Sequence, residues 1–353
     1  MNKKIFVIWV TRKCNLRCEY CYEKKNQNNL SMDVKTALET AEYIINDIEV
    51  NKLKQCDIHF HGGEPLLNTK CIELLINIIS KRCTKCSIKY SLTTNGTIFS
   101  DRIYNSILKK IDTLSISIDG SKTSHNEQRK FLDGTGTFEK VYYNYLKIRK
   151  KRSDLRIRMT ITSKNVNVLL DNFIFLVNQG IYYIDPAIDF FDQGWNKDNF
   201  KYLEENLTNI KEYIARQNLN ISFDLIESDL YQMIGCGGGS QNINIDIDGN
   251  IYICTFVVGN KSFEIGDIIS GIKTKKIEGI FKKFSKDFKE CCGCLIKPYC
   301  IATNCRILQY ALTLDAETPA PILCCLQQMK YKFWKKEHCN QKGDLNEITS
   351  RKG

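Results

Sequence analysis

Three cysteines near the start of the chain are spaced so that their thiolates can bind one metal centre. Cys14, Cys18 and Cys21 follow the apolar run Ile5–Val10 in the pattern CxxxCxxC. A cubane [4Fe–4S] cluster has four irons, so three thiolates would leave one iron without a protein ligand. Structural zinc sites are closed, whereas catalytic metal sites keep a position open. The spacing therefore predicts a catalytic iron–sulfur site, and the alternative is a zinc site that a distant histidine completes.

A second set of cysteines lies in the last third of the chain. The 353 residues include 17 cysteines, and no basic and apolar leader opens the sequence. The absence of such a leader and of a long apolar run predicts a cytoplasmic protein without a membrane segment. Disulfides do not persist in that compartment, so dense cysteine there indicates metal or redox chemistry. The candidate ligands are Cys236, Cys254, Cys291, Cys294, Cys300, Cys305 and Cys324, with Cys325 as the substitute for Cys324.

Apolar runs that alternate with helix-period segments supply the elements that would position these residues. Strands that alternate with helices indicate βαβ units and a parallel sheet. Six units are fewer than the eight of a closed barrel, so we predict an α/β fold with an open, partial (β/α)6 TIM-like barrel. The predicted strands are Ile5–Val10, Cys56–Phe60, Ser87–Thr93, Thr113–Ile118, Arg156–Ile161 and Ile181–Phe190. The predicted helices are Met32–Ile48 (with Ser31 as N-cap), Lys70–Lys81, Asp101–Lys110, Thr137–Arg149 and Val166–Asn178.

The character of the sequence changes after about Leu230. Gln241–Cys254 alternates around Asp248-Gly249, which predicts a hairpin. The apolar stripe within Lys276–Lys289 predicts a helix that docks on the barrel. Little regular pattern follows Cys291, as is typical of a small region that metal holds together. We therefore expect a barrel over residues 1–230, a cysteine-rich domain over residues 231–330 and a basic C-terminal helix or tail over residues 331–353.

Further short motifs accompany the first cysteine motif, and together they resemble the radical S-adenosylmethionine (SAM) superfamily. Each lies at or just beyond the end of a predicted strand, where α/β barrels build their sites. They are Tyr22 after the cysteines, Gly62-Gly63-Glu64-Pro65, Thr93-Thr94-Asn95-Gly96, Ser115-Ile116-Ser117-Ile118-Asp119-Gly120, and Arg129 with the glycine-rich stretch 134–138 of the peptide-modifying branch. The SAM-binding residues that this resemblance implies are Tyr20, Gly62, Gly63, Glu64, Thr94, Asn95, Ser117, Asp119 and Arg129.

The resemblance also implies the chemistry of the first site. The open iron would chelate the amine and carboxylate of SAM. Tyr20 would pack against the adenine, and Glu64 would accept a hydrogen bond from the methionine amine. Gly62 and Gly63 would let the backbone approach the ligand closely. In the family, a flavodoxin- or ferredoxin-type reductant supplies the electron that cleaves the C5′–S bond of SAM. The 5′-deoxyadenosyl radical then takes a hydrogen atom from the substrate.

The second set of cysteines resembles the SPASM domain of radical SAM peptide maturases. The resemblance implies two auxiliary [4Fe–4S] clusters, and therefore three clusters in all, although the spacing before Cys305 is one residue longer than usual. The nearer cluster has no evident fourth ligand, with Cys292 a weak candidate, so an open iron could bind a substrate thiolate. A zinc ribbon of two sites is the alternative. The implied ligands are Cys236, Cys254 and Cys305 for the nearer cluster, and Cys291, Cys294, Cys300 and Cys324 for the distal one.

We interpret the chain as a maturase of a ribosomally made peptide. Thioether cross-linking of a cysteine to a neighbouring carbon fits a nearer cluster with three protein ligands, and other C–C or C–O cross-links are alternatives. Anaerobic sulfatase maturation, which makes formylglycine, uses an aspartate where this chain has Thr255. Since 13 residues precede Cys14, leader recognition would need a separate leader-peptide-binding protein or the SPASM region. A non-enzymatic multi-cluster electron carrier would leave Gly62–Pro65 and Ser115–Asp119 without a purpose.

The remaining features support no further site. The formal charge of +11 comes from Lys and Arg spread along the chain, whereas nucleic-acid binders more often cluster Arg with aromatic residues. We therefore expect no nucleic-acid partner. Cys56 and Cys71 are predicted to be buried, apolar side chains. Cys83 and Cys86 have CxxC spacing, but they precede a strand and should lie at the end of the barrel opposite the active site.

Overall fold

Six parallel strands form an open barrel and follow one another in the order of the sequence. The computed structural model describes residues 3–25, 28–223, 225 and 235–338 of the chain. Each strand hydrogen-bonds to the next, with Ile8 opposite Phe60 and Phe60 opposite Leu92. The predicted partial barrel is therefore confirmed. Its strands are β1 (Lys3–Thr11), β2 (Gln55–Gly62), β3 (Ser87–Thr94), β4 (Thr113–Ser117), β5 (Arg156–Ile161) and β6 (Ile184–Ile188).

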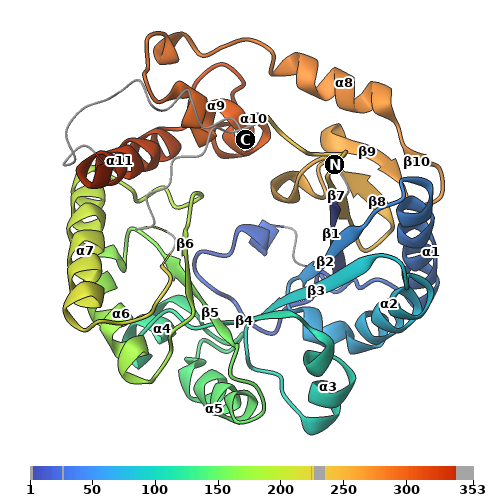
Figure 1. Ribbon diagram of the computed structural model, residues 1–353, viewed down its shortest axis with the longest axis horizontal. Coiled ribbons are helices and arrows are strands. Elements are labelled where there is room, and N and C mark those ends of the chain that lie inside the picture. Colours follow the sequence, from blue (N-terminus) through green and yellow to red (C-terminus); the bar gives the residue numbers. More distant parts are fainter. Residues whose placement is uncertain (1–2, 26–27, 224, 226–234, 339–353) are drawn as a thin grey trace.

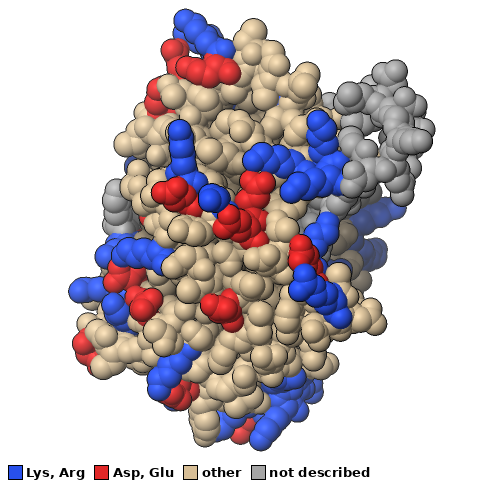
Figure 2. Space-filling view, turned by 90° about the vertical axis from the view of Figure 1, so that its left-hand side faces the viewer, with Lys and Arg blue, Asp and Glu red and all other residues tan. Residues whose placement is uncertain are grey.

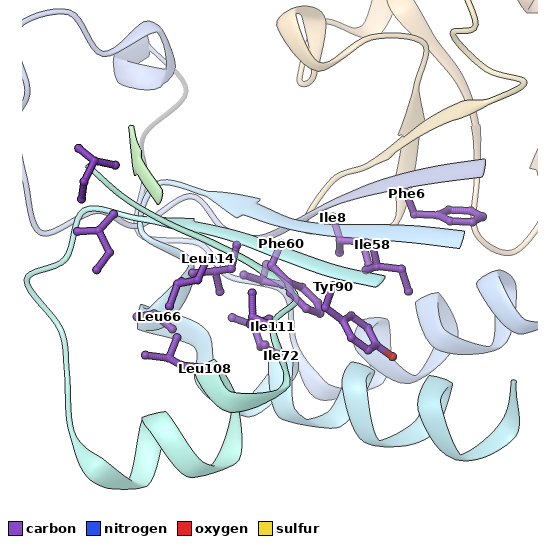
Figure 3. Close-up of a cluster of buried hydrophobic side chains, with 14 of the residues drawn as sticks. Phe6, Ile8, Ile58, Phe60, Leu66, Ile72, Tyr90, Leu108, Ile111 and Leu114 are labelled. Carbon is purple, nitrogen blue, oxygen red and sulfur yellow. The ribbon is translucent and has the colours of Figure 1, made fainter. Parts of the chain in front are cut away.

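Helices cover the outer side of these strands, and the main hydrophobic core lies between the two layers (Figure 1). Figure 3 shows part of this core, where the rings of Phe60 and Tyr90 stack with centroids 6.0 Å apart. Cys56 and Cys71 are buried in it, as expected. The helices of this part are α1 (Val34–Val50), α2 (Thr69–Arg82), α3 (Asp101–Ser106), α4 (Lys122–Gln128), α5 (Phe138–Arg149), α6 (Leu169–Asn178) and α7 (Lys197–Arg216).

Four further strands extend the same sheet beyond β1. The strand β7 (Asn242–Ile245) runs parallel to β1, with Ile5 opposite Asn242. Three antiparallel strands follow, namely β8 (Asn250–Tyr252), β9 (Glu264–Asp267) and β10 (Gly271–Ile272). The turn between β7 and β8 contains Gly249 at φ +82°, a conformation that glycine adopts without strain, and the predicted hairpin is confirmed. The cysteine-rich part of the chain is therefore fixed to the barrel by a continuous backbone ladder.

The C-terminal helices lie in the gap that the open barrel leaves between its last strand and β10 (Figure 1). They are α8 (Thr274–Lys283), α9 (Ile301–Asn304), α10 (Arg306–Thr313) and α11 (Pro321–His338). The helix α11 lies beside α7, where Lys332 Nζ is 3.0 Å from Glu204 Oε2. The chain thus forms a ring, with the loop that follows β1 on its inner side.

Two predicted boundaries near the cysteine-rich part are wrong. The helix expected over Lys276–Lys289 ends at Lys283, because Phe284 turns inward and packs against Phe263 and Tyr310. The basic C-terminal helix, expected from residue 331, begins ten residues earlier at Pro321. Cys324 and Cys325 therefore lie on a helix rather than in an irregular segment.

The predicted start of the first helix is also wrong, and α7 was not predicted. Asp33, not Ser31, caps α1, because Asp33 Oδ1 accepts the Thr36 N–H at 2.7 Å. The Ser31 hydroxyl oxygen instead lies 2.7 Å from that of Thr11 and so ties the chain back to β1. The start of α7 has a reciprocal cap between Asn196 and Asn199, a signal that the sequence does contain.

Charges of both signs are interspersed on the surface that carries α7 and α11. Figure 2 shows Lys and Arg alternating with Asp and Glu on this face. Many of these side chains form exposed ion pairs, such as Arg216 with Glu212. Among the helices that the structure describes, none has the length and apolar character needed to cross a membrane.

Candidate active site

The loop between β1 and α1 carries Cys14, Cys18 and Cys21 at the carboxyl end of β1. Burial raises the pKa of Cys14 to about 11 and that of Cys18 to about 12. A thiolate at Cys21 raises both values further, so the three sulfur atoms lie near one another. Thiols with a raised pKa keep their protons until a metal displaces them. The loop therefore holds three thiols near one another, and their binding of a cluster stays a prediction.

Backbone hydrogen bonds hold this loop against the segment that follows α4. The Arg17 N–H donates to the Lys130 carbonyl at 2.8 Å, and the Glu19 N–H donates to the Gln128 carbonyl at 2.9 Å. The residue number rises from 17 to 19 in one segment while it falls from 130 to 128 in the other, so the two segments are antiparallel. The residue between the two donors, Cys18, therefore lies directly opposite Arg129.

The glycine pair at the end of β2 serves a close approach between two backbone segments. A Cβ atom at Gly62 would lie 2.2 Å from the Thr11 carbonyl oxygen, and Gly62 has φ +146°. A Cβ atom at Gly63 would lie 2.3 Å from the Lys13 carbonyl oxygen. The sequence predicts that these glycines let the backbone approach a ligand closely, and that contact stays a prediction. The structure shows that they approach the backbone of Thr11 and Lys13, where the cysteine loop begins. Any side chain at either position would push this loop away from β2.

Glu64 is fully buried beside this pair, and its carboxylate accepts hydrogen bonds from its own chain. The donors are the Leu66 N–H at 3.1 Å, the Thr94 hydroxyl at 2.8 Å and the Asn95 N–H at 2.7 Å. The Asn95 side-chain amide donates to Asn15 Oδ1 in the cysteine loop at 2.9 Å. Burial raises the pKa of Glu64 to about 7. The structure thus brings together Glu64, Thr94 and Asn95, and their contact with SAM stays a prediction.

Asp119 accepts four hydrogen bonds at the end of β4. Arg129 Nε and Nη2 donate to its two oxygens at 2.7 and 3.1 Å, and the Tyr20 hydroxyl donates at 2.9 Å. The fourth donor is the Thr160 N–H at 2.8 Å. The Arg129 guanidinium carbon also lies 5.2 Å from the centre of the Tyr20 ring. Ser117, buried at the end of the same strand, completes the predicted SAM set.

Arg12 connects the cysteine loop to the β7–β8 turn. Its guanidinium donates to Glu23 Oε2 at 3.2 Å and to Asp246 Oδ2 at 2.5 Å. All three side chains are buried. Charges that are removed from water in this way interact strongly, so the pairing fixes the two segments relative to each other.

Cys236, Cys254 and Cys305 come together from three separate segments. Burial raises the pKa of Cys254 to about 12, and thiolates at Cys305 and Cys236 raise it further. The pKa of Cys305 is likewise raised by burial and by Cys236. Cys292, which sequence reasoning considered as a fourth ligand, is exposed.

Cys291, Cys294, Cys300 and Cys324 surround a small cavity of about 20 Å³. Cys325 is not among its lining residues, although it follows Cys324 on α11. Within the described residues, no three Cys, His, Asp or Glu side chains form a site for a single metal ion. The assignment of these thiols to two clusters therefore stays a prediction. The ligands of an iron–sulfur cluster bind different irons and need not converge on one point.

A cavity of about 600 Å³ opens between the cysteine loop and the C-terminal part of the chain. Residues 19–24 of the loop form one wall, and segments that follow β5, β6 and β8 form others, together with α10. The cavity is lined by Cys21 on one side and by Phe256, two residues after Cys254, on another. A large concave site with convergent polar groups is typical of a substrate pocket.

Three aromatic rings from different segments meet at this cavity. Tyr22, Phe191 and Phe256 have ring centroids 5.9 to 6.0 Å apart in all three pairings. The Tyr22 hydroxyl oxygen lies 2.8 Å from His61 Nε2, and the His61 ring packs on Trp9 at 4.4 Å. Sequence reasoning did not place His61, Phe191 or Phe256 in the site. Their positions at or after strand ends were a usable signal for His61 and Phe191.

Asp189 lines the same cavity just after β6, and sequence reasoning missed it as well. Its Oδ1 accepts the Phe191 N–H at 3.0 Å, and its carbonyl accepts the Trp195 indole N–H at 3.0 Å. Burial raises the pKa of Asp189 to about 6, and the nearby Asp192 carboxylate contributes. A carboxyl group with such a pKa can gain or lose a proton near neutral pH.

Residues 8–166 match the family model described as the Radical SAM superfamily. Over these 159 of its 353 residues, the chain is similar to the radical SAM superfamily. The matched residues include the end of β1, the strands β2 to β5 and all the predicted SAM-binding residues. The family uses SAM and one [4Fe–4S] cluster, and the three thiols near Cys14 with the buried acceptors beside them fit such a cofactor pair.

Curated relatives match different shares of this chain. An uncharacterised protein of Methanocaldococcus jannaschii is 32% identical over 179 residues, which are 50% of this chain and 60% of that protein. A cysteine-type anaerobic sulfatase-maturating enzyme of Clostridium perfringens is 27% identical over 312 residues, which are 80% of this chain and 83% of that enzyme. The radical SAM cyclopropyl synthase TigE of Paramaledivibacter caminithermalis is 26% identical over 289 residues, which are 76% of this chain and 57% of that enzyme.

Solved structures share the fold of this chain beyond the barrel. Native anSMEcpe with bound AdoMet and Cp18Cys peptide superposes with a TM-score of 0.79 at 20% identity, over 96% of this chain and 98% of that one. SuiB of Streptococcus suis bound to the precursor peptide SuiA has a TM-score of 0.65 at 16% identity, over 91% of this chain and 75% of that one. The C-terminal cysteine-rich part is therefore a component of the shared fold.

Proposed function

We propose that this radical SAM enzyme modifies a peptide or protein in the cavity between the cysteine loop and the C-terminal part. The observation that carries the proposal is the cavity itself, which is lined by Cys21 and by segments that adjoin the second group of cysteines. Relatives of the chain include a sulfatase-maturating enzyme, and a structural neighbour holds a precursor peptide. Both facts support a peptide substrate.

The chain's own residues would prepare the SAM half of the reaction. Cys14, Cys18 and Cys21 would hold a [4Fe–4S] cluster, whose open iron supplies the electron that cleaves SAM when both are bound. Glu64 would accept a hydrogen bond from the ammonium group of SAM. The Thr94 hydroxyl already orients this carboxylate by donating to Glu64 Oε1 at 2.8 Å. The remaining predicted contacts are Tyr20, Gly62, Gly63, Asn95, Ser117, Asp119 and Arg129.

For the bond that forms, we propose a thioether between a substrate cysteine and a neighbouring carbon. Cys236, Cys254 and Cys305 would hold a nearer auxiliary cluster with one open iron, which could bind the substrate thiolate. Cys291, Cys294, Cys300 and Cys324 would hold a distal cluster. The grouping of these thiols supports this assignment.

Formylglycine formation is the second candidate, favoured by the coverage of the sulfatase-maturating relative. The position after Cys254 argues against it, because the side chain there is the hydroxyl of Thr255. That hydroxyl donates to Asn244 Oδ1 at 2.8 Å and is not a base at neutral pH. A proton acceptor for this reaction would have to come from elsewhere in the cavity.

Two anaerobic experiments test the proposal. Iron-loaded protein with SAM and dithionite should release 5′-deoxyadenosine, and the Cys18→Ala variant should not. If the loaded protein releases no 5′-deoxyadenosine, even with peptide, the enzyme proposal fails and the result favours the multi-cluster electron carrier.

The second experiment separates the two candidate reactions by mass spectrometry. A co-expressed cysteine-containing precursor should lose two hydrogens and gain a cysteine that resists alkylation. The Cp18Cys peptide serves as the comparison substrate. Conversion of its thiol to an aldehyde would establish formylglycine formation and overturn the thioether proposal.

A further inference from the structure

Cys18 and Arg129 are directly opposed residues of a short antiparallel pairing. The bonds from Arg17 N–H and Glu19 N–H lie on either side of the pair, and Leu16 and Phe131 form a bridge two residues further along. Directly opposed residues in such a pairing have Cβ atoms about 4.5–5.5 Å apart. The side chains of Arg129 and Cys18 therefore leave the backbone next to each other.

The Arg129 side chain cannot move to solvent, because both it and its partner are buried. Arg129 is 5% exposed and Asp119 is 0% exposed. The two hydrogen bonds from Arg129 to Asp119 fix the plane of the guanidinium, and the Tyr20 ring lies against it. An ion pair held in this way behaves as a rigid dipole.

Of the two charged residues, Arg129 is the one that lies opposite Cys18 in the backbone pairing. Asp119 follows β4 and is bonded to the cysteine loop through the Tyr20 hydroxyl, two residues beyond Cys18. The two charges therefore lie at different places relative to the thiol and do not cancel there.

We propose that Arg129, positioned by Asp119, raises the reduction potential of the cluster that Cys14, Cys18 and Cys21 hold. The inference rests on the proposed ligation of that cluster. Reduction adds one negative charge to the cluster and its thiolates, and a fixed positive charge nearby stabilises the more negative state. Arg129 is a positioning and tuning residue in this scheme, acting through the Cys18 ligand. It would make the electron that cleaves SAM easier to supply.

A redox titration without SAM, followed by electron paramagnetic resonance (EPR), tests this inference. The relevant signal is the one that added SAM perturbs and that Cys18→Ala lacks. In Arg129→Gln the midpoint potential should become more negative by about 59 mV. At the wild-type midpoint potential, this shift lowers the ratio of reduced to oxidised cluster about tenfold. Arg129→Lys keeps the charge and should restore a midpoint close to wild type.

Two further variants give the sign of the effect and its control. Asp119→Asn removes the opposing negative charge, so its midpoint should move to a more positive potential. Arg152→Gln removes a guanidinium that pairs with Asp154 elsewhere in the chain, and its midpoint should match wild type.

The outcomes separate this inference from the proposed function. An unchanged midpoint in Arg129→Gln, with iron content intact, overturns the inference and leaves the enzyme proposal standing. A negative shift in Asp119→Asn overturns it as well, even if Arg129→Gln fails to assemble a cluster. A wild-type protein without any SAM-perturbed signal contradicts the proposed function itself.

Discussion

The Tyr22 hydroxyl oxygen and His61 Nε2 lie 2.8 Å apart beside the candidate substrate cavity. The Gly62 N–H lies 2.8 Å from His61 Nδ1 and can only donate, so Nδ1 is the acceptor. Burial lowers the pKa of His61 to about 4, and in the neutral ring the proton is then on Nε2. His61 therefore donates to Tyr22, which leaves the Tyr22 proton for a ligand in the cavity.

Tyr22→Phe should weaken peptide binding without preventing SAM cleavage. The substitution keeps the ring that stacks on Phe191 and removes the donor for a peptide carbonyl. One net hydrogen bond of about 1 kcal/mol predicts a rise of about fivefold in the KM for the precursor peptide. Steady-state kinetics, with 5′-deoxyadenosine release measured separately, check this. Tyr182→Phe, at an exposed tyrosine, is the control, and an unchanged KM in Tyr22→Phe would refute the role of the hydroxyl.

Acid should destabilise the fold through His125, a second buried histidine. Its Nδ1 lies 3.3 Å from the Asp119 N–H and its Nε2 lies 2.8 Å from the Thr137 hydroxyl. Burial lowers its pKa to about 4, against the raising effect of Asp119, with Arg129 lowering it further. The unfolded state therefore binds more protons than the native state between pH 6.5 and pH 4, and stability falls as pH falls through that window.

Chemical unfolding of the metal-free protein at several pH values measures this effect. The free energy of unfolding should lose about 1.4 kcal/mol per pH unit at this site between pH 6.5 and 4. His125→Gln should be less stable at pH 7 but should show a shallower pH dependence. Equal slopes for the two proteins would exclude His125 as the source.

The strands were predictable because their signals are local in sequence. The predicted strand Arg156–Ile161 has the bounds that the structure shows. The four cysteines assigned by spacing to the distal set line one cavity, and their binding of a cluster stays a prediction. The contacts between distant segments were not predictable. Nothing in the local sequence around Arg12 indicates a bond to Asp246, and the partners of Asp119 depend on where the segment after α4 folds back. The contact of Gly62 with SAM stays a prediction, whereas its backbone crowding against Thr11 appears only in three dimensions.

Asp189 should give the modification reaction an acidic limb near pH 6. Asp189 lines the cavity, and we expect its carboxylate to accept a hydrogen bond from the substrate. Burial raises its pKa to about 6, so this acceptor is lost as pH falls below that value. Asp189→Asn should abolish this limb in the pH profile of kcat/KM for the peptide. Asp171→Asn, at an exposed position in the first turn of α6, should keep it. An unchanged limb in Asp189→Asn would assign the titration to another group.

Iron content should distinguish the two adjacent cysteines of α11. Three [4Fe–4S] clusters predict about twelve irons per chain. Cys324→Ala should lose about four of them, because Cys324 lines the distal cavity, whereas Cys325→Ala should lose none. Anaerobic reconstitution followed by iron and sulfide analysis measures both. The reverse result would identify Cys325 as the ligand in place of Cys324. A wild-type content of about four irons per chain would contradict the presence of both auxiliary clusters.

Arg12 should contribute to stability through its two buried carboxylate partners. Arg12→Met leaves Asp246 as a buried charge without its cation, and breaking a buried pair in this way typically costs about 3–5 kcal/mol. Replacing the two carboxylates that Arg12 binds as well, with Glu23→Gln and Asp246→Asn, removes the buried charges and should recover most of that loss. Unfolding of the metal-free proteins at pH 7 gives both values. If the triple variant is as unstable as Arg12→Met, packing of the Arg12 side chain, and not its charge, holds the cysteine loop to the β7–β8 turn.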